Sequence, residues 1–198
     1  MLSANIDRTP EGVLTFAGYD VVKLAKQYGT PLYLMDEERI RANCRMYIQA
    51  FHKHFGWDAL PLYASKAASF RRIYQIMAEE GMGVDVVSSG ELYTALSAGF
   101  PAENIYFHGN CKTDADLTLG VQRGIGCFIV DNREELLSLE RIAEEAGITQ
   151  KIMLRVTPGI DPHTYEAVST GKVDSKFGAA VETGQAMEQV KLALAQPH

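Results

Sequence analysis

Short apolar runs alternate with longer segments in which apolar residues recur at helical spacing along most of the chain. The short runs predict strands over 31–35, 60–65, 84–87, 105–108, 127–130 and 151–156. The longer segments predict helices over 36–54, 69–80, 89–98, 114–123, 132–146 and 182–195. Strands that alternate with helices in this way indicate parallel β/α units.

The residues at the ends of the predicted helices support this organisation. Ser88 and Asp131 each precede a helix and are followed three residues later by a glutamate, which is capping-box spacing. Glycines that can adopt a left-handed conformation stand where four helices should end, at Gly81, Gly99, Gly124 and Gly147. A long polar loop over 158–178 separates the last predicted strand from the last helix, and loops of this length are usually either functional or disordered.

Two architectures fit this pattern, an open doubly wound sheet and a closed (β/α)8 barrel of the TIM type. A dinucleotide-binding sheet needs G-x-G-x-x-G after its first strand, but Gly81-Met82-Gly83 and Gly124-Ile125-Gly126 precede strands and lack the third glycine. The barrel is therefore favoured. A complete barrel has eight strands and roughly 250 residues, so this α/β chain is expected to be an incomplete, truncated barrel.

Composition and charge narrow the classes of function. The 198 residues are 46% hydrophobic and 22% charged, with a net charge of −6 and no block rich in lysine and arginine. This balance argues against a nucleic-acid surface. No apolar run reaches the roughly 18 residues of a membrane span. The three cysteines are far apart without metal-ligand spacing, so we expect reduced thiols, a cytoplasmic protein and no metal site.

The most informative candidate for chemistry is Lys66, in the run Leu60-Pro61-Leu62-Tyr63-Ala64-Ser65-Lys66-Ala67. It stands at the end of a predicted strand and just before a helix, which in a β/α barrel is the mouth where active sites lie. A partly desolvated amine there can lose its proton and form a Schiff base with an aldehyde such as pyridoxal phosphate. Taken alone, a lysine in this position is more often a solvated loop residue.

Several motifs in order along the chain resemble the N-terminal portion of the diaminopimelate decarboxylase family, pyridoxal-phosphate enzymes with an alanine-racemase-like barrel. The motifs are Thr30-Pro31-Leu32-Tyr33, Tyr63-Ala64-Ser65-Lys66-Ala67, Gly83-Val84-Asp85-Val86-Val87-Ser88-Ser89-Gly90-Glu91-Leu92, Phe107-His108-Gly109-Asn110, Leu154-Arg155-Val156-Thr157-Pro158-Gly159, and His163-Thr164-Tyr165-Glu166 through Ser169-Thr170-Gly171 to Ser175-Lys176-Phe177-Gly178. Together these motifs are specific, whereas any one alone would be weak.

The resemblance implies that Lys66 binds pyridoxal phosphate covalently and serves as the catalytic lysine. Three further residues are candidates for binding the cofactor, each with a plain structural alternative. Asp85 either places its carboxylate near the cofactor or only caps a helix. Arg155 either lies under the cofactor ring or points outward and forms an ion pair. His108 hydrogen-bonds the ligand or only a backbone carbonyl.

The same resemblance implies decarboxylation of meso-2,6-diaminopimelate to L-lysine and CO2 by the parent enzyme, with a small amino-acid substrate and a homodimeric full-length form. Residues 1–35 are then an N-terminal segment whose strand 31–35 associates with a missing β domain, and 36–198 form part of the pyridoxal-phosphate barrel. We expect the chain to be inactive alone. The alternatives are a sister decarboxylase of another basic amino acid, a racemase of the same fold, and a non-catalytic barrel protein that binds pyridoxal phosphate.

Overall fold

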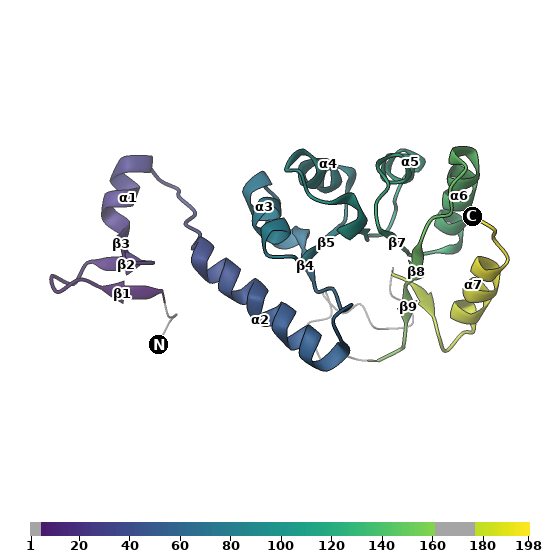
Figure 1. Ribbon diagram of the computed structural model, residues 1–198, viewed down its shortest axis with the longest axis horizontal. Coiled ribbons are helices and arrows are strands. Elements are labelled where there is room, and N and C mark those ends of the chain that lie inside the picture. Colours follow the sequence, from purple (N-terminus) through teal and green to yellow (C-terminus); the bar gives the residue numbers. More distant parts are fainter. Residues whose placement is uncertain (1–4, 161–176) are drawn as a thin grey trace.

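A five-stranded parallel sheet forms the centre of the computed structural model, which describes residues 5–160 and 177–198. The strands follow one another in sequence order and are β4 (Leu62–Ala64), β5 (Gly83–Val86), β6 (Ile105–Phe107), β7 (Cys127–Val130) and β8 (Ile152–Leu154). The helices α3 (Arg71–Glu79), α4 (Ser89–Ser97), α5 (Asp114–Arg123) and α6 (Arg133–Ala146) connect them and lie along one side of the sheet (Figure 1). The predicted β/α units are confirmed, and the arrangement is an incomplete barrel.

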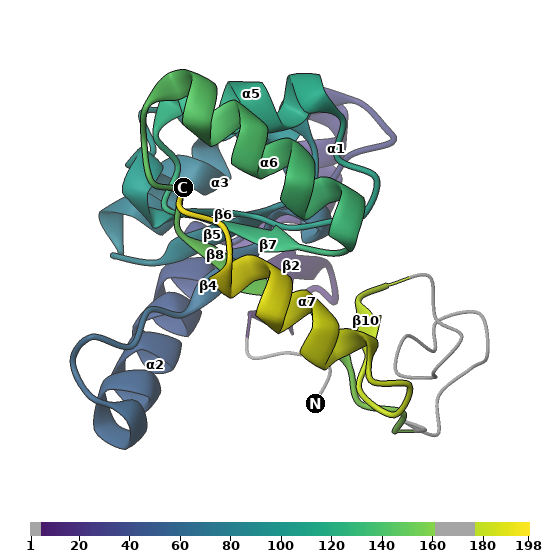
Figure 2. The ribbon, with the colours of Figure 1, turned by 90° about the vertical axis from the view of Figure 1, so that its right-hand side faces the viewer.

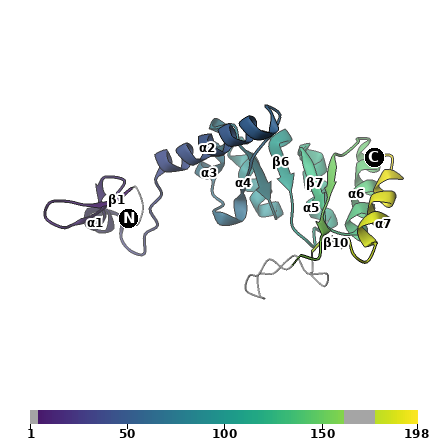
Figure 3. The same cartoon turned by 90° about the horizontal axis from the view of Figure 1, so that it is seen from below.

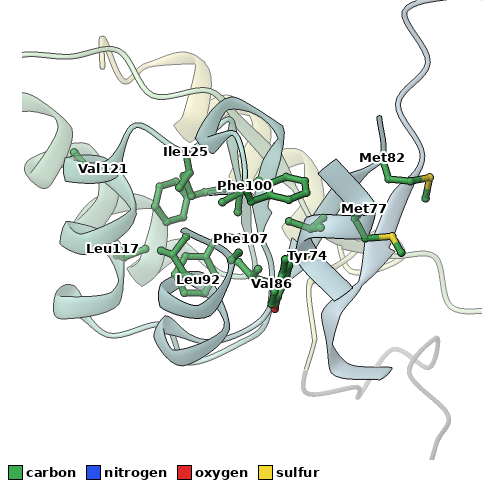
Figure 4. Close-up of a cluster of buried hydrophobic side chains, with 14 of the residues drawn as sticks. Tyr74, Met77, Met82, Val86, Leu92, Phe100, Phe107, Leu117, Val121 and Ile125 are labelled. Carbon is green, nitrogen blue, oxygen red and sulfur yellow. The ribbon is translucent and has the colours of Figure 1, made fainter. Parts of the chain in front are cut away.

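The hydrophobic core lies between this sheet and its four helices. The side chains of Val84, Val86 and Phe107 are fully buried there, and the Phe107 and Phe128 rings stack with their centroids 5.7 Å apart. Figure 4 shows Tyr74 and other core side chains reaching from the helices toward these strands. Because successive strand residues point to opposite faces, this buried set identifies the helix-covered face of the sheet.

The opposite face of the sheet is partly open. Strand pairing aligns Ala64 with Asp85, Asp85 with Tyr106, and Tyr106 with Cys127, so these four residues share that face. Met153 lies on it as well, being the partner of Ile129, and its side chain is 48% exposed. A closed barrel would bury this face inside its cylinder. In this chain it is the wall on which polar side chains can meet a ligand.

Side-chain caps begin the helices that follow the strands. Ser88 Oγ accepts a hydrogen bond from the Glu91 amide at 3.2 Å, as its spacing predicts. The predicted cap at Asp131 is wrong by one residue, since Asn132 accepts from the Glu135 amide at 2.9 Å. This shift leaves the Asp131 side chain free to make a contact elsewhere, because Asn132 performs the capping role. The four glycines predicted to end helices all have positive φ.

The N-terminal part of the chain forms its own small antiparallel sheet, which the sequence pattern did not predict. Its strands are β1 (Ile6–Arg8), β2 (Leu14–Phe16) and β3 (Tyr19–Asp20), and α1 (Val21–Tyr28) follows. Residues 31–35 form no strand within the described part of the chain, and their association with a separate β domain stays a prediction. The long helix α2 (Glu37–Phe55) connects this unit to the central sheet, and Figure 3 shows the two at opposite ends of α2.

Beyond β8 the chain forms a second, two-stranded parallel pair. β9 (Val156–Thr157) pairs with β10 (Ala179–Ala180), and α7 (Gln185–Leu194) follows (Figure 2). Most of the predicted loop over 158–178 lies outside the described residues. Within those residues no helix is both long and apolar enough to span a membrane.

Candidate cofactor site

Lys66 lies in a single 3-10 turn, Ser65–Ala67, that directly follows β4. The sequence therefore places it correctly at the carboxyl end of the first central strand. The expected partial burial is wrong for the described chain, where Lys66 is exposed and makes no hydrogen bond or ion pair with residues 5–160 or 177–198. The physical reason is that β4 is an edge strand of an open sheet, so no second neighbouring strand among the described residues shields the turn that follows it.

Asp85 and His108 come together at the carboxyl ends of β5 and β6. The His108 Nδ1 atom lies 3.6 Å from Asp85 Oδ2, and both side chains are partly buried. Pairing of β5 with β6 produces this proximity, because it aligns Asp85 with Tyr106, and His108 lies two residues beyond Tyr106 on the same open face of the sheet. Asp85 is not a helix cap, since Ser88 performs that role.

Three polar atoms near this strand edge are buried without a hydrogen-bond partner within the described part of the chain. They are Ser65 Oγ in the turn after β4, Asp85 Oδ1 on β5, and His108 Nε2 directly after β6. Buried polar atoms in folded proteins are nearly always paired with protein, water or ligand. A polar ligand with several acceptors and donors would satisfy them, so the residues present fit a pyridoxal phosphate molecule beside Lys66.

Arg155 follows β8 and lies on the open face, in line with Met153. Its Nη1 atom is 3.5 Å from Asp131 Oδ1, and its guanidinium lies 4.1 Å from the centre of the Phe177 ring. The arginine thus forms an ion pair with the residue that follows β7, and its place beneath the cofactor ring stays a prediction. Arg155 stands two strands away from His108, so the predicted residues form two groups along one edge rather than a single cluster.

Sequence reasoning missed a buried ion pair next to these groups. Lys112 Nζ lies 2.9 Å from Glu135 Oε1, and the two side chains are only 2% and 3% exposed. Burial raises the pKa of the Glu135 carboxyl, and the nearby Lys112 ammonium opposes that rise. The only signal in the sequence was that Lys112 follows the Phe107-His108-Gly109-Asn110 motif, and nothing in the spacing pointed to a partner 23 residues away.

This geometry defines a β/α-barrel wall with a lysine, a carboxylate, a histidine and an arginine at its carboxyl edge. Residues 38–198 match the family described as "Pyridoxal-dependent decarboxylase, pyridoxal binding domain", and the chain belongs to that family. Its cofactor class is therefore pyridoxal phosphate.

Individual relatives indicate which decarboxylases of this family the chain is similar to. The chain is 46% identical over 184 residues to the diaminopimelate decarboxylase of Bacillus methanolicus. This alignment covers 93% of this chain and 42% of that protein. It is 41% identical over 194 residues to the enzyme of the same name from Mycobacterium tuberculosis, covering 98% of this chain and 42% of the relative. The chain thus spans less than half the length of these relatives.

Solved structures agree with this assignment. The diaminopimelate decarboxylase of M. jannaschii in co-complex with L-lysine superimposes with a TM-score of 0.86 at 36% identity, covering 98% of this chain and 45% of that one. A lysine/ornithine decarboxylase from Vibrio vulnificus, complexed with putrescine, has a TM-score of 0.66 at 22% identity over 95% of this chain and 43% of the other. The second likeness concerns the fold alone.

Proposed function

We propose that the full-length protein decarboxylates meso-2,6-diaminopimelate to L-lysine and CO2, and that this chain supplies the lysine that binds pyridoxal phosphate. The observation that carries the proposal is the common edge of Lys66, Asp85 and His108, with three buried polar atoms awaiting partners. The resemblance to enzymes named diaminopimelate decarboxylase supports the substrate.

Each residue has a distinct proposed task. Lys66 forms the covalent bond to the cofactor aldehyde, and its exposed position leaves it accessible to that aldehyde. Asp85 and His108 hold the ring and accept or donate hydrogen bonds through Oδ1 and Nε2. Arg155 supplies a fixed positive charge at the far end of the edge, oriented by Asp131. When bound, pyridoxal phosphate draws electrons from the carbon that loses CO2.

We further propose that the chain alone has no appreciable turnover. β4 and β8 are the two edges of an open sheet, so their outer backbone groups lack strand partners among the described residues. Lys66 lies next to one of those open edges, where water reaches it freely. Release of CO2 from diaminopimelate by the purified chain with added pyridoxal phosphate would contradict this proposal.

We also propose a cellular location and an oligomeric state for the full-length protein. A cytoplasmic site is supported by three unpaired cysteines, two of them buried, which suit a reducing compartment. A homodimeric full-length form is what the family resemblance implies.

The deciding experiment is covalent trapping of pyridoxal phosphate on the purified chain. The visible absorbance of the lysine-bound cofactor is recorded, the bond is reduced with borohydride, and the modified peptide is identified by mass spectrometry. We expect one stoichiometric adduct on Lys66 that is lost in Lys66→Ala. Lys151→Ala is the matched control, because Lys151 is also exposed but precedes β8 at the opposite edge of the sheet. Equal labelling of many lysines would overturn the proposed cofactor site.

A further inference from the structure

We infer that Lys112 and Glu135 form a buried positioning pair that holds His108 on one side and Arg155 on the other. The inference rests on the proposed function in one respect, namely that His108 and Arg155 belong to the cofactor site. Neither Lys112 nor Glu135 touches that site in this arrangement. They act through the backbone and through Asp131.

The ammonium group of Lys112 is fully used by the protein. Besides the Glu135 contact, it donates a hydrogen bond to the Gly109 carbonyl at 2.6 Å and another to the Ile129 carbonyl at 3.1 Å. Two hydrogen bonds and one ion pair thus join Lys112 to three segments: the loop after β6, strand β7, and the first turn of α6. With a side chain 2% exposed, Lys112 is buried away from a ligand. Its role is therefore to connect segments.

The first connection controls the backbone next to His108. Gly109 has φ of 92°, and a Cβ there would lie 3.1 Å from the Val87 carbonyl oxygen, so the loop packs tightly against the end of β5. Cys111, two residues later, also has positive φ (57°), which is unfavourable for a residue with a side chain. The Lys112 bond to Gly109 holds this loop closed, and His108 directly precedes it.

The second connection runs through Glu135 to Arg155. Glu135 Oε2 accepts a hydrogen bond from the Asp131 amide at 3.4 Å. The Asp131 side chain, 3% exposed, then contacts Arg155, whose guanidinium lies over Phe177. Glu135 thus orients the end of β7 from which Asp131 reaches the arginine. The pair lies between the two groups of site residues and can hold both.

Stability alone does not account for this pair. Removing two charges from water costs several kcal/mol per ion, and replacing a buried ion pair with apolar residues of similar volume is often neutral or stabilising. Apolar residues at 112 and 135 could fill the same space, but they could not bind the Gly109 and Ile129 carbonyls or the Asp131 amide. The distinctive contribution of the charged pair is therefore the geometry of the loops it joins.

The test compares the double variant Lys112→Met/Glu135→Leu with Asp114→Asn/Arg141→Gln. Arg141 on α6 and Asp114, which begins α5 two residues after Lys112, form an exposed ion pair, so the second variant is a matched control. In the cofactor-free chain, NMR spectra record the His108 ring signals, assigned with His108→Gln, and the Arg155 side-chain Nε–H signal. Pyridoxal phosphate affinity is measured by absorbance titration.

We expect the His108 and Arg155 signals to shift and broaden in Lys112→Met/Glu135→Leu, while the other four histidines and the thermal midpoint change little. Affinity for pyridoxal phosphate should fall about tenfold, the low end of the effect of losing an outer partner that orients a ligand group. The control should keep both signals and the affinity. Unchanged His108 and Arg155 signals in the folded double variant would overturn the inference.

If the double variant does not fold, Glu135→Gln provides the same test, because it keeps the size of the side chain while removing the charge that faces Lys112. Shifted His108 and Arg155 signals in Glu135→Gln would support the inference, and unchanged signals would overturn it. The NMR readout needs no cofactor, so it separates the two proposals. Failure of the natural chain to bind pyridoxal phosphate would refute the proposed function, whereas unchanged NMR signals in the variants would refute the positioning pair.

Discussion

The imidazole of His108 and the carboxylate of Asp85 face each other across neighbouring strands, with Nδ1 3.6 Å from Oδ2. The outer atom of each group, Nε2 and Oδ1, is buried and has no partner in the described part of the chain. Each residue thus contacts the other through one atom and has a second atom available for a ligand. This is the arrangement expected of two groups that bind a ligand together.

Asp85→Asn should weaken pyridoxal phosphate binding by about 10–100-fold, because a hydrogen bond to a charged group contributes about 1.5–3 kcal/mol. The measurement is an absorbance titration of the chain with the cofactor. Asp58→Asn is the control, since Asp58 is exposed and lies outside the central strands. In a double-mutant cycle with His108→Gln, the two effects should not add, because the residues are in contact. Additive effects would show that Asp85 and His108 act separately.

The alternation of strand and helix could be predicted because each central strand is apolar on its helix-covered face. Val84 and Val86 are fully buried there. The sequence pattern also placed Lys66 and His108 at the carboxyl ends of predicted strands and Asp85 and Arg155 within predicted strands, and parallel strands bring their carboxyl ends to one edge. What it could not predict was which of them touch, because that depends on strand neighbours and side-chain reach.

The features that the sequence pattern did not predict also have specific physical causes. An apolar run such as 31–35 becomes a strand only if another strand lies beside it, and a single segment cannot show whether one does. The strands β1 to β3 are two or three residues long, too short to display an alternating pattern. The pair of Lys112 and Glu135 joins a loop to the next helix, so its formation depends on how α6 is rotated over the sheet.

Stability should depend on pH through Glu80, where α3 meets α2. Arg45 and Arg41 both hydrogen-bond its carboxylate, and they lower the pKa of Glu80 from 4.5 to about 2. A carboxyl whose pKa is lower in the folded state stabilises the fold above the unfolded pKa, and this contribution is lost as pH falls toward the folded value. Glu80→Gln should therefore unfold several degrees earlier than the natural chain at pH 7.

The decisive observation is how that difference changes with pH. The gap in thermal midpoint between Glu80→Gln and the natural chain should be constant above about pH 5.5 and shrink from about pH 4.5 toward pH 2. Glu144→Gln, an exposed position on α6, should show little gap at any pH. A gap that stays the same at pH 3 and pH 7 would mean that the arginine contacts of Glu80 do not control its ionisation.

The three cysteines should differ sharply in reactivity. Cys111 is exposed, whereas Cys44 and Cys127 are buried, and burial raises the pKa of both buried thiols. Since the thiolate is the reactive form, a disulfide reagent at pH 8 should modify one thiol rapidly and the other two only on unfolding. Cys111→Ser should abolish the rapid phase. Rapid loss of all three thiols in the folded chain would contradict the packing of Cys44 against Met77.

Two glycines separated by one residue, Gly124 and Gly126, resemble part of a nucleotide-binding turn but have separate structural tasks. Gly124 ends α5 in the left-handed conformation, with φ of 63°. Gly126 lies against the backbone of Glu103, where an added Cβ would be only 2.0 Å from the carbonyl oxygen. Gly126→Ala must therefore displace the backbone before β6 or β7, and we expect it to destabilise the chain by about 1–3 kcal/mol.

Gly90→Ala is the matched control for that substitution. Gly90 lies within α4, and the nearest atom to an added Cβ is Ser88 Oγ at 3.9 Å. Alanine favours the helix over glycine, so this variant should be more stable than the natural chain by about 0.5–1 kcal/mol. Urea unfolding of both variants measures the two effects with opposite signs. Equal stability of Gly126→Ala and the natural chain would mean that the close approach to Glu103 relaxes without loss, and that Gly126 is not required for packing.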